Sequence, residues 1–291
     1  MLEVDLTPLE MDVRPLVMDY LRRFPPEVSE LTFTNLFVWR KWRPVWLLEQ
    51  DGLLALICGG HDSEGRHVLG PTLGGNPDPL ALRSAVPDLM GYIRIPETTA
   101  GFLRQAGLTV TPDEDNSDYV YRTADLAELK GEKYHKKRNL VAQCLETHNC
   151  RYEALTRKLI PDCIASLDQW CFARREDLTP ELAAEYQAIR EMFTHYEQLE
   201  LSGGAVLVNG CVQAYAVGEA LTPTTAVCHF EKAASEVKGL GQVINQWFAA
   251  NAVRQFEYVN REQDLGIPGL RHSKQSYYPH HQVHKFIARF P

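Results

Sequence analysis

The sequence lacks the features that mark several specialised classes of protein. Its seven cysteines form an odd set without a Cys-x-x-Cys pair, so it predicts neither a disulfide framework nor a zinc knuckle, and we predict no metal site. No run of about 18 apolar residues is present, which excludes a transmembrane helix. The first sixteen residues are acidic and do not resemble a signal peptide. We therefore expect a cytoplasmic protein.

Positive charge is also scarce, because 30 Lys and Arg stand against 38 Asp and Glu, a net charge of −8. Such a surface argues against DNA as a partner. One basic run is the exception, and it consists of Lys130, Lys133, His135, Lys136, Lys137 and Arg138. Lys136, Lys137 and Arg138 are candidates for contacting the phosphates of a charged tRNA or of a peripheral lipid head group. The alternative is a solvated helix between two domains.

What the sequence does contain is a repeated order of elements in 291 residues, a length typical of about two domains. Each half has helices, a hairpin and then a strand, a helix and a strand. Asp51-Gly52 and Asn209-Gly210 predict the two hairpin turns. We expect an α+β protein with a mixed, helix-flanked sheet in each half. The predicted divisions are a domain at 1–125, a basic connecting helix at 126–150 and a domain at 151–291.

The second half carries a strand, a glycine-containing turn and a helix at 242–254. Free N–H groups at such a helix start favour an anion. The predicted donor-binding residues are Lys238, Gly239, Leu240, Gly241 and Gln242. Glu231, at the end of the strand, is the predicted general base. A tight turn without a ligand is the alternative interpretation.

A polar segment at 260–279 follows the next strand, where α/β sheets place ligands. The predicted substrate-binding residues there are Asn260, Arg261, Asp264, Arg271 and Lys274. Arg271 and Lys274 would share one face of a helical turn. Tyr277 and Tyr278 are candidates for donating a proton to a leaving group. The same residues would also suit an ion network that only holds the loop.

These segments resemble known patterns. Gly239 and Gly241 match the two glycines in the pyrophosphate-binding turn of GNAT acetyltransferases. Those enzymes carry Gln or Arg at the position where this sequence has Glu236. Two further stretches resemble the C-terminal domain family of bacterial phosphatidylglycerol lysyltransferase. The first is Asn260-Arg261-Glu262-Gln263-Asp264-Leu265-Gly266 with Leu270-Arg271, Lys274 and Tyr278-Pro279. The second is Asp118-Tyr119-Val120-Tyr121 with Leu126, Leu129, Lys130-Gly131 and Lys133 to Leu140.

The resemblance implies two tandem GNAT-like (acyl-CoA N-acyltransferase) folds. It also implies a transferase, since members move an aminoacyl group from charged tRNA to a lipid head group. We therefore expect an acyltransferase that uses aminoacyl-tRNA or acyl-CoA as donor and an amine or hydroxyl as acceptor. The alternative is a non-catalytic GNAT-like module that binds RNA, a lipid head group or a protein, an interpretation that the acidic Glu236 favours.

Overall fold

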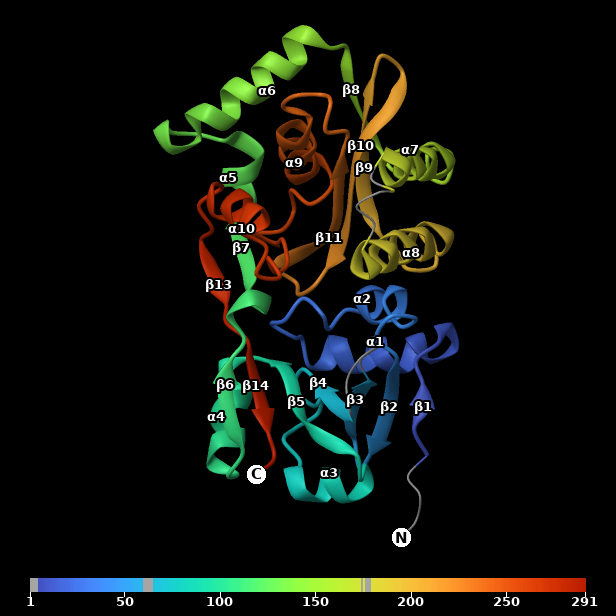
Figure 1. The fold of residues 1–291 in the computed structure, drawn as a ribbon, viewed down its shortest axis with the longest axis vertical. Helices are drawn as coiled ribbons and strands as arrows, with labels where there is room; N and C mark the ends of the chain where they lie inside the picture. The colour runs from blue at the N-terminus through green and yellow to red at the C-terminus, as the bar shows by residue number, and fades with distance from the viewer. Residues whose placement is uncertain (1–4, 60–64, 174, 176–178) are drawn as a thin grey trace. The chain divides into compact units, whose positions relative to one another are not determined.

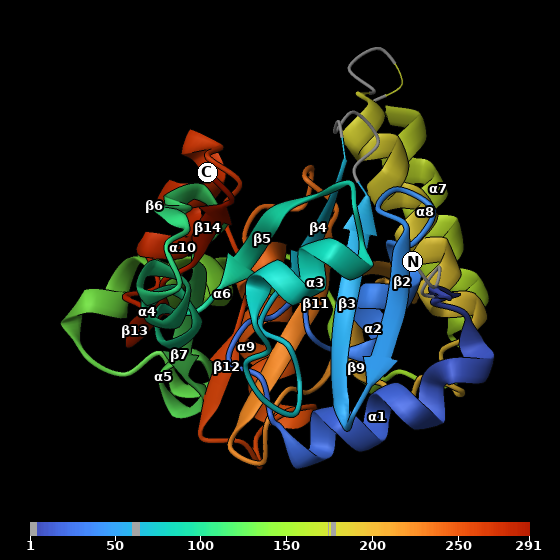
Figure 2. The same cartoon turned by 90° about the horizontal axis from the view of Figure 1, so that it is seen from below.

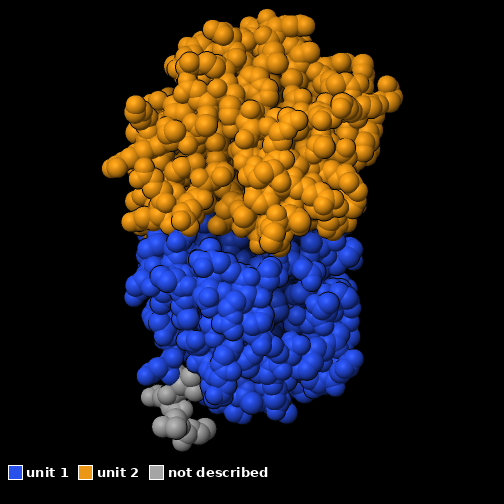
Figure 3. Space-filling view, turned by 180° about the vertical axis from the view of Figure 1, so that it is seen from behind, with its two compact units in different colours: residues 1–118, 263–271, 282–291 blue, residues 119–262, 272–281 orange. Residues whose placement is uncertain are grey.

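A computed structural model describes residues 5–59, 65–173, 175 and 179–291 (Figure 1). They form two compact units, each with its own seven-stranded sheet. Unit 1 contains residues 1–118, 263–271 and 282–291, and unit 2 contains residues 119–262 and 272–281 (Figure 3). The units are thus discontinuous in sequence and do not follow the contiguous divisions at 125 and 150 that we expected.

The sheet of unit 1 has the order β1-β2-β3-β4-β5-β14-β6, in which only β4 and β5 pair in parallel. Its strands are β1 Thr7–Pro8, β2 Val45–Gln50, β3 Leu53–Gly59, β4 Arg66–Leu69, β5 Leu89–Ile95, β6 Thr109–Pro112 and β14 Phe286–Arg289. Its helices are α1 Arg14–Arg23, α2 Phe33–Val38, α3 Pro79–Ala85 and α4 Glu97–Gln105, with short 3-10 turns η1 Met11–Val13 and η2 Glu114–Asn116. Apolar side chains of α3 and α4 share a core with β3, β4 and β5, and Figure 2 shows the arrangement of these helices and strands.

The sheet of unit 2 has the order β13-β7-β12-β11-β10-β9-β8. Its strands are β7 Asp118–Arg122, β8 Cys150–Ala154, β9 Ser202–Val208, β10 Cys211–Ala220, β11 Thr225–Ala233, β12 Tyr258–Asn260 and β13 His281–Val283. The helical segments are α5 Thr123–Glu128, η3 Glu132–Tyr134, α6 His135–Thr147, α7 Ile160–Ala173, α8 Pro180–Thr194 and α9 Leu240–Asn251. Helix α10 Pro268–Gln275 begins in unit 1 and ends in unit 2. Helix α9 covers one face of β9, β10 and β11, and α7 and α8 lie on the other face (Figure 1).

Both predicted hairpins are confirmed. Asp51 and Gly52 have φ values of 53° and 76°, and Asn209 and Gly210 have values of 51° and 87°. Two consecutive positive φ values are the signature of a type I′ turn, which Asp-Gly and Asn-Gly adopt readily. The expected α+β class with mixed sheets is also confirmed, because each sheet combines antiparallel pairs with a parallel pair.

The single basic helix expected at 126–150 is not observed. It is broken at Leu129, which has a left-handed φ of 48°, and resumes as α6. The polar segment at 260–279 contains helix α10, on which Arg271 and Lys274 both lie. Further along the chain, β13 and β14 belong to different sheets.

Candidate functional site

A bulge in β11 sets the direction of the side chains that follow it. On β10, Val217 pairs with Phe230 and Gly218 pairs with Cys228, so His229 is an additional residue in β11. An extra residue reverses the alternation of side chains along a strand. Cys228 belongs to the core beneath α9, and the bulge allows Glu231, three residues later, to reach that face as well.

Glu231 forms an ion pair with Arg261 beyond the point where β11 and β12 pair. The parallel pairing ends at Val227 and Asn260, whereas β11 continues to Ala233. The Arg261 Nη2 atom lies 3.1 Å and 3.2 Å from the two carboxylate oxygens of Glu231. The carboxylate therefore holds a cation in place, an arrangement that favours a positioning role for Glu231 over that of a proton acceptor.

Two polar atoms in this cluster are buried without a partner. Within the described part of the chain, Arg261 Nη1 and Asn245 Oδ1 make no hydrogen bond, although Asn245 Nδ2 donates to Glu231 at 3.0 Å. Burying an unsatisfied group is costly, and more so when it is charged. The two atoms therefore have unused hydrogen-bonding capacity, one as a donor and one as an acceptor.

The ring of Tyr277 lies next to two cations. Lys137 Nζ is 4.1 Å from the ring centroid, and the Arg261 guanidinium carbon is 5.0 Å from it. Burial raises the pKa of Tyr277, so its hydroxyl stays protonated, and it shares a hydrogen bond with Gln242. Lys137 Nζ also donates to Ser276 Oγ at 2.7 Å, and burial followed by the charge of Arg261 lowers the pKa of Lys137. The structure thus brings together Glu231, Arg261, Tyr277, Lys137 and Gln242, five of the predicted residues.

The main chain around Arg261 is fixed on two sides. Lys274 Nζ donates to the carbonyl oxygens of Arg261 and Glu262, and the Asn260 side chain accepts from the amide of Glu262 at 2.8 Å. The Glu262 carboxylate binds His229 Nδ1 at 2.9 Å. Lys274 and Asn260, which were predicted to bind substrate, are therefore buried supports of the Arg261 segment.

The turn between β11 and α9 is largely closed on itself. The amide of Leu240 donates to the Val237 carbonyl at 3.1 Å, and the amide of Gln242 donates to the Gly239 carbonyl at 3.0 Å. Gly239 has a φ of 88°, and a Cβ atom there would lie 2.3 Å from the Leu140 carbonyl of α6. Two amides expected to meet an anion are thus engaged within the turn. Lys238 is exposed, and Gly241 is partly exposed.

The other predicted residues lie apart from this cluster. In unit 1, Arg271 binds Asp264 at 2.8 Å and Asp115 at 2.7 Å, whereas Lys274 donates to the carbonyl oxygens of Arg261 and Glu262. Arg138 donates to carbonyl oxygens at the end of α5. Lys136 is exposed, and Tyr278 is 48% exposed.

Sequence reasoning missed Asn245, and it missed the contacts of His229 with two carboxylates. His229 donates to Glu262 and also lies 2.9 Å from Glu219. Burial alone lowers the pKa of His229, but hydrogen bonds and charges of Glu219 and Glu262 overcome that effect and raise it to about 9. The bulge that places His229 could not be read from the sequence, because it depends on pairing with β10.

Comparisons with known proteins identify the family and the fold. Residues 21–289 match the family model for the C-terminal part of phosphatidylglycerol lysyltransferase. The chain belongs to this family. The resemblance predicted from its motifs is thereby confirmed. No curated protein sequence matched.

Three solved structures resemble this lysyltransferase-family chain. A conserved protein of unknown function from Bacteroides thetaiotaomicron has 26% identity and a TM-score of 0.90, with 99% of this chain and 100% of that chain covered. L-PGS from Bacillus licheniformis has 11% identity and a TM-score of 0.65, covering 94% and 91%. A tandem GNAT protein from the clavulanic acid pathway has 9% identity and a TM-score of 0.51, covering 98% and 97%. The predicted tandem GNAT-like fold is therefore confirmed. Over the residues that the structure describes, no helix is both long and apolar enough to cross a membrane.

Proposed function

We propose that unit 2 transfers an acyl or aminoacyl group to an amine or hydroxyl acceptor. The observation that carries this proposal is the unpartnered Nη1 atom of Arg261, next to the ends of the parallel strands β11 and β12. Ligands of α/β sheets bind at the carboxyl ends of strands. A carbonyl oxygen of the donor would satisfy Nη1, and the charge would stabilise the oxyanion that forms when the acceptor attacks.

The surrounding residues support this role for Arg261. Glu231 accepts a hydrogen bond from Nη2 of Arg261 and leaves Nη1 without a contact to this carboxylate. Lys274 fixes the main chain by donating to the carbonyl oxygen of Arg261. Lys137 adds a second cation near the Tyr277 ring. The protonated Tyr277 hydroxyl would donate a proton to the leaving group and regain one from the attacking amine or hydroxyl, so the step is balanced in protons. Family membership favours aminoacyl-tRNA as donor, and the GNAT-like fold favours acyl-CoA, with a lipid head group or an amine as acceptor.

The exposed part of the basic run would contact the donor if it is a tRNA. Lys136 is exposed on α6, one residue before Lys137, which faces the cluster. The helix would thus contact nucleic-acid phosphates through Lys136 while Lys137 lies beside the reacting group. Binding of tRNA through this helix should weaken steeply with salt, and Lys136→Gln should reduce that salt dependence.

The test is transfer of a radiolabelled group. The protein is incubated with tRNA charged with labelled amino acids, or with labelled acetyl-CoA, and with phosphatidylglycerol vesicles or small amines as acceptors. We expect labelled product, and we expect Arg261→Gln to lower the rate by about 100-fold or more, as for loss of an oxyanion donor. Arg157→Gln, which alters an exposed arginine of the same unit, is the matched control. Equal rates for Arg261→Gln and wild type would refute the proposal.

A non-catalytic binding module is the second candidate, and the turn before α9 favours it. The amides of Leu240 and Gln242 are used within the turn, and Glu236 is exposed at the position where GNAT enzymes carry Gln or Arg. Both features weaken binding of a pyrophosphate. If the protein retains labelled tRNA or lipid but forms no product with either charged tRNA or acetyl-CoA, the result would support the binding module and exclude the transferase.

A further inference from the structure

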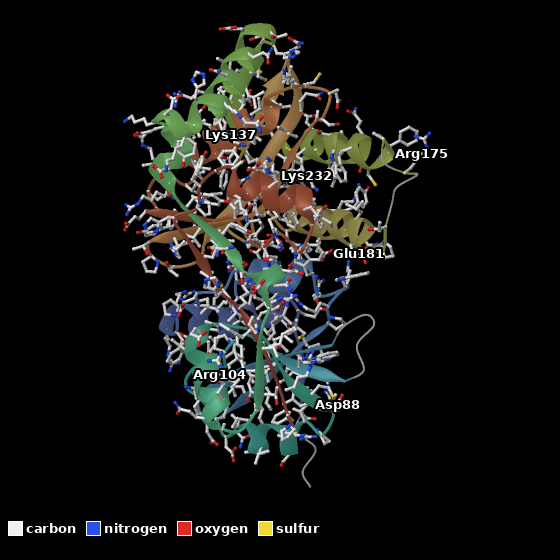
Figure 4. The ribbon with its side chains drawn as sticks, turned by 60° about the vertical axis from the view of Figure 1, so that its left-hand side comes forward. Asp88, Arg104, Lys137, Arg175, Glu181 and Lys232 are labelled. Carbon is white, nitrogen blue, oxygen red and sulfur yellow. The ribbon has the colours of Figure 1, made fainter. Side chains whose placement is uncertain are left out.

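A cavity of about 70 Å³ lies on the other face of the unit 2 sheet. Its walls come from α7, β10, the last residues of β11 and the turn that follows. Lys232, labelled in Figure 4, is adjacent to Glu231 in sequence but reaches this face instead, where it contacts Trp170 of α7 and Glu185 of α8. The cavity is thus separate from the Arg261 cluster, although both lie beside the same turn.

Tyr215 contributes a hydroxyl without a partner to this region. The residue is 1% exposed and lines the cavity, and its oxygen makes no hydrogen bond to any residue that the structure describes. Its ring is held edge-on by Phe193, with ring centroids 5.2 Å apart. Because a buried hydroxyl without a partner is costly, a polar group in the cavity is its natural complement.

The charges around the cavity balance one another. Lys232 Nζ lies 2.7 Å from Glu185 and 4.2 Å from the Trp170 ring. Behind the wall, Arg190 forms an ion pair with Asp168 at 3.1 Å. Glu236, on the lining, is exposed to solvent, which screens its charge. An anionic occupant would therefore have to displace an existing ion pair, and a cationic one would meet only the solvent-screened Glu236. An uncharged occupant needs neither.

We propose that this cavity is a ligand site for a carboxamide group. The carbonyl oxygen of the carboxamide accepts from the Tyr215 hydroxyl. Its NH₂ group is matched by the side chains of Gln169 and Gln213, which also line the cavity and offer both donors and acceptors. A cavity of about 70 Å³ holds roughly five water-sized groups, which fits a carboxamide with one or two attached carbons.

The test uses three probes of the same shape and different charge: acetamide, acetate and acetamidinium. Binding is measured by saturation-transfer NMR with the full chain. We expect acetamide to bind with a millimolar Kd and both charged probes to bind more weakly. Tyr215→Phe keeps the ring and removes only the hydroxyl, so it should weaken acetamide binding about fivefold, the value of one hydrogen bond. Tyr258→Phe, on β12, should leave the Kd unchanged.

Several results would overturn the proposal. If no probe binds saturably, the cavity holds water only. If Tyr215→Phe binds acetamide as well as wild type does, the hydroxyl is not part of a site. If acetate or acetamidinium binds as tightly as acetamide, the cavity does not select an uncharged group. A thermal melt of Tyr215→Phe identifies a variant that fails to fold, and in that case Gln213→Leu provides the same comparison from another residue of β10.

Discussion

Replacing His229 with glutamine should remove most of the pH dependence that this protein's stability shows between neutral and alkaline pH. The imidazole is buried and lies 2.9 Å from both Glu219 and Glu262. The two carboxylates raise its pKa from 6.5 to about 9 against the opposing effect of burial. Because the folded pKa is raised, the stabilising contribution is fully present below about pH 6.5 and is lost as the pH rises through about 9.

The magnitude follows from the shift of the pKa. A change from 6.5 to about 9 corresponds to about 3 kcal/mol at roughly 1.4 kcal/mol per unit. Wild-type stability should therefore fall by about 1.4 kcal/mol for each pH unit within this interval. His229→Gln retains a donor for one carboxylate but cannot titrate, so the wild type should lose most of its advantage over it by pH 9.

The assay is urea unfolding at several pH values between 6 and 9.5, with NMR titration of the imidazole as an independent measurement. His272→Gln, which alters an exposed histidine of the same unit, should follow the wild-type curve. A His229 that titrates near 6.5, or a stability difference between wild type and His229→Gln that is the same at every pH, would refute the reasoning. The same deprotonation weakens the hold on Glu262, so activity that depends on Arg261 should decline over the same interval.

Two substitutions test other parts of the fold by chemical denaturation. Lys285 is fully buried and lies 2.6 Å from both Glu30 and Asp118, so Lys285→Met should cost about 3–5 kcal/mol, because both carboxylates lose this cation, although Glu30 keeps its ion pair with Arg94; a loss below about 1 kcal/mol would contradict this. Gly239→Ala should destabilise by more than about 1 kcal/mol, because of its positive φ and the carbonyl of α6 at 2.3 Å from a Cβ atom. Gly101→Ala, in α4 with open space around it, should instead stabilise by up to about 1 kcal/mol, and equal effects of the two changes would contradict the argument.

The elements that the sequence predicted well are those determined by neighbouring residues. Asp51-Gly52 and Asn209-Gly210 specify their turns through backbone preferences alone. The strand β14 shows the opposite case. It lies between β5 and β6, about 170 residues or more earlier in the chain, and no local pattern records such a partner. The contiguous domain boundaries differ from the observed units for the same reason.

In the candidate site, too, the sequence indicated individual residues but not the contacts between residues that are far apart in the chain. Glu231 and Arg261 were each singled out because polar residues that follow a strand face a ligand-binding edge, but their ion pair joins residues 30 positions apart. The spacing of three residues led us to expect Arg271 and Lys274 to act together, whereas each has its own partners within the protein. Asn245 gave no signal, because an asparagine within an amphipathic helix is indistinguishable from many others until the strand beneath it is known.

One extra residue in β11 links the Arg261 cluster to the carboxamide cavity. Side chains alternate along a regular strand, so a shift by one position exchanges the two faces. With His229 in the bulge, Glu231 meets Arg261 and Asn245 on the α9 side, and Lys232 meets Trp170 and Glu185 on the opposite side. Without the bulge, the lysine would face Arg261, two like charges together, and the carboxylate would face Glu185. The ion pairs of His229 thus stabilise the register in which each charged side chain, Glu231 on one face and Lys232 on the other, meets a partner of opposite charge.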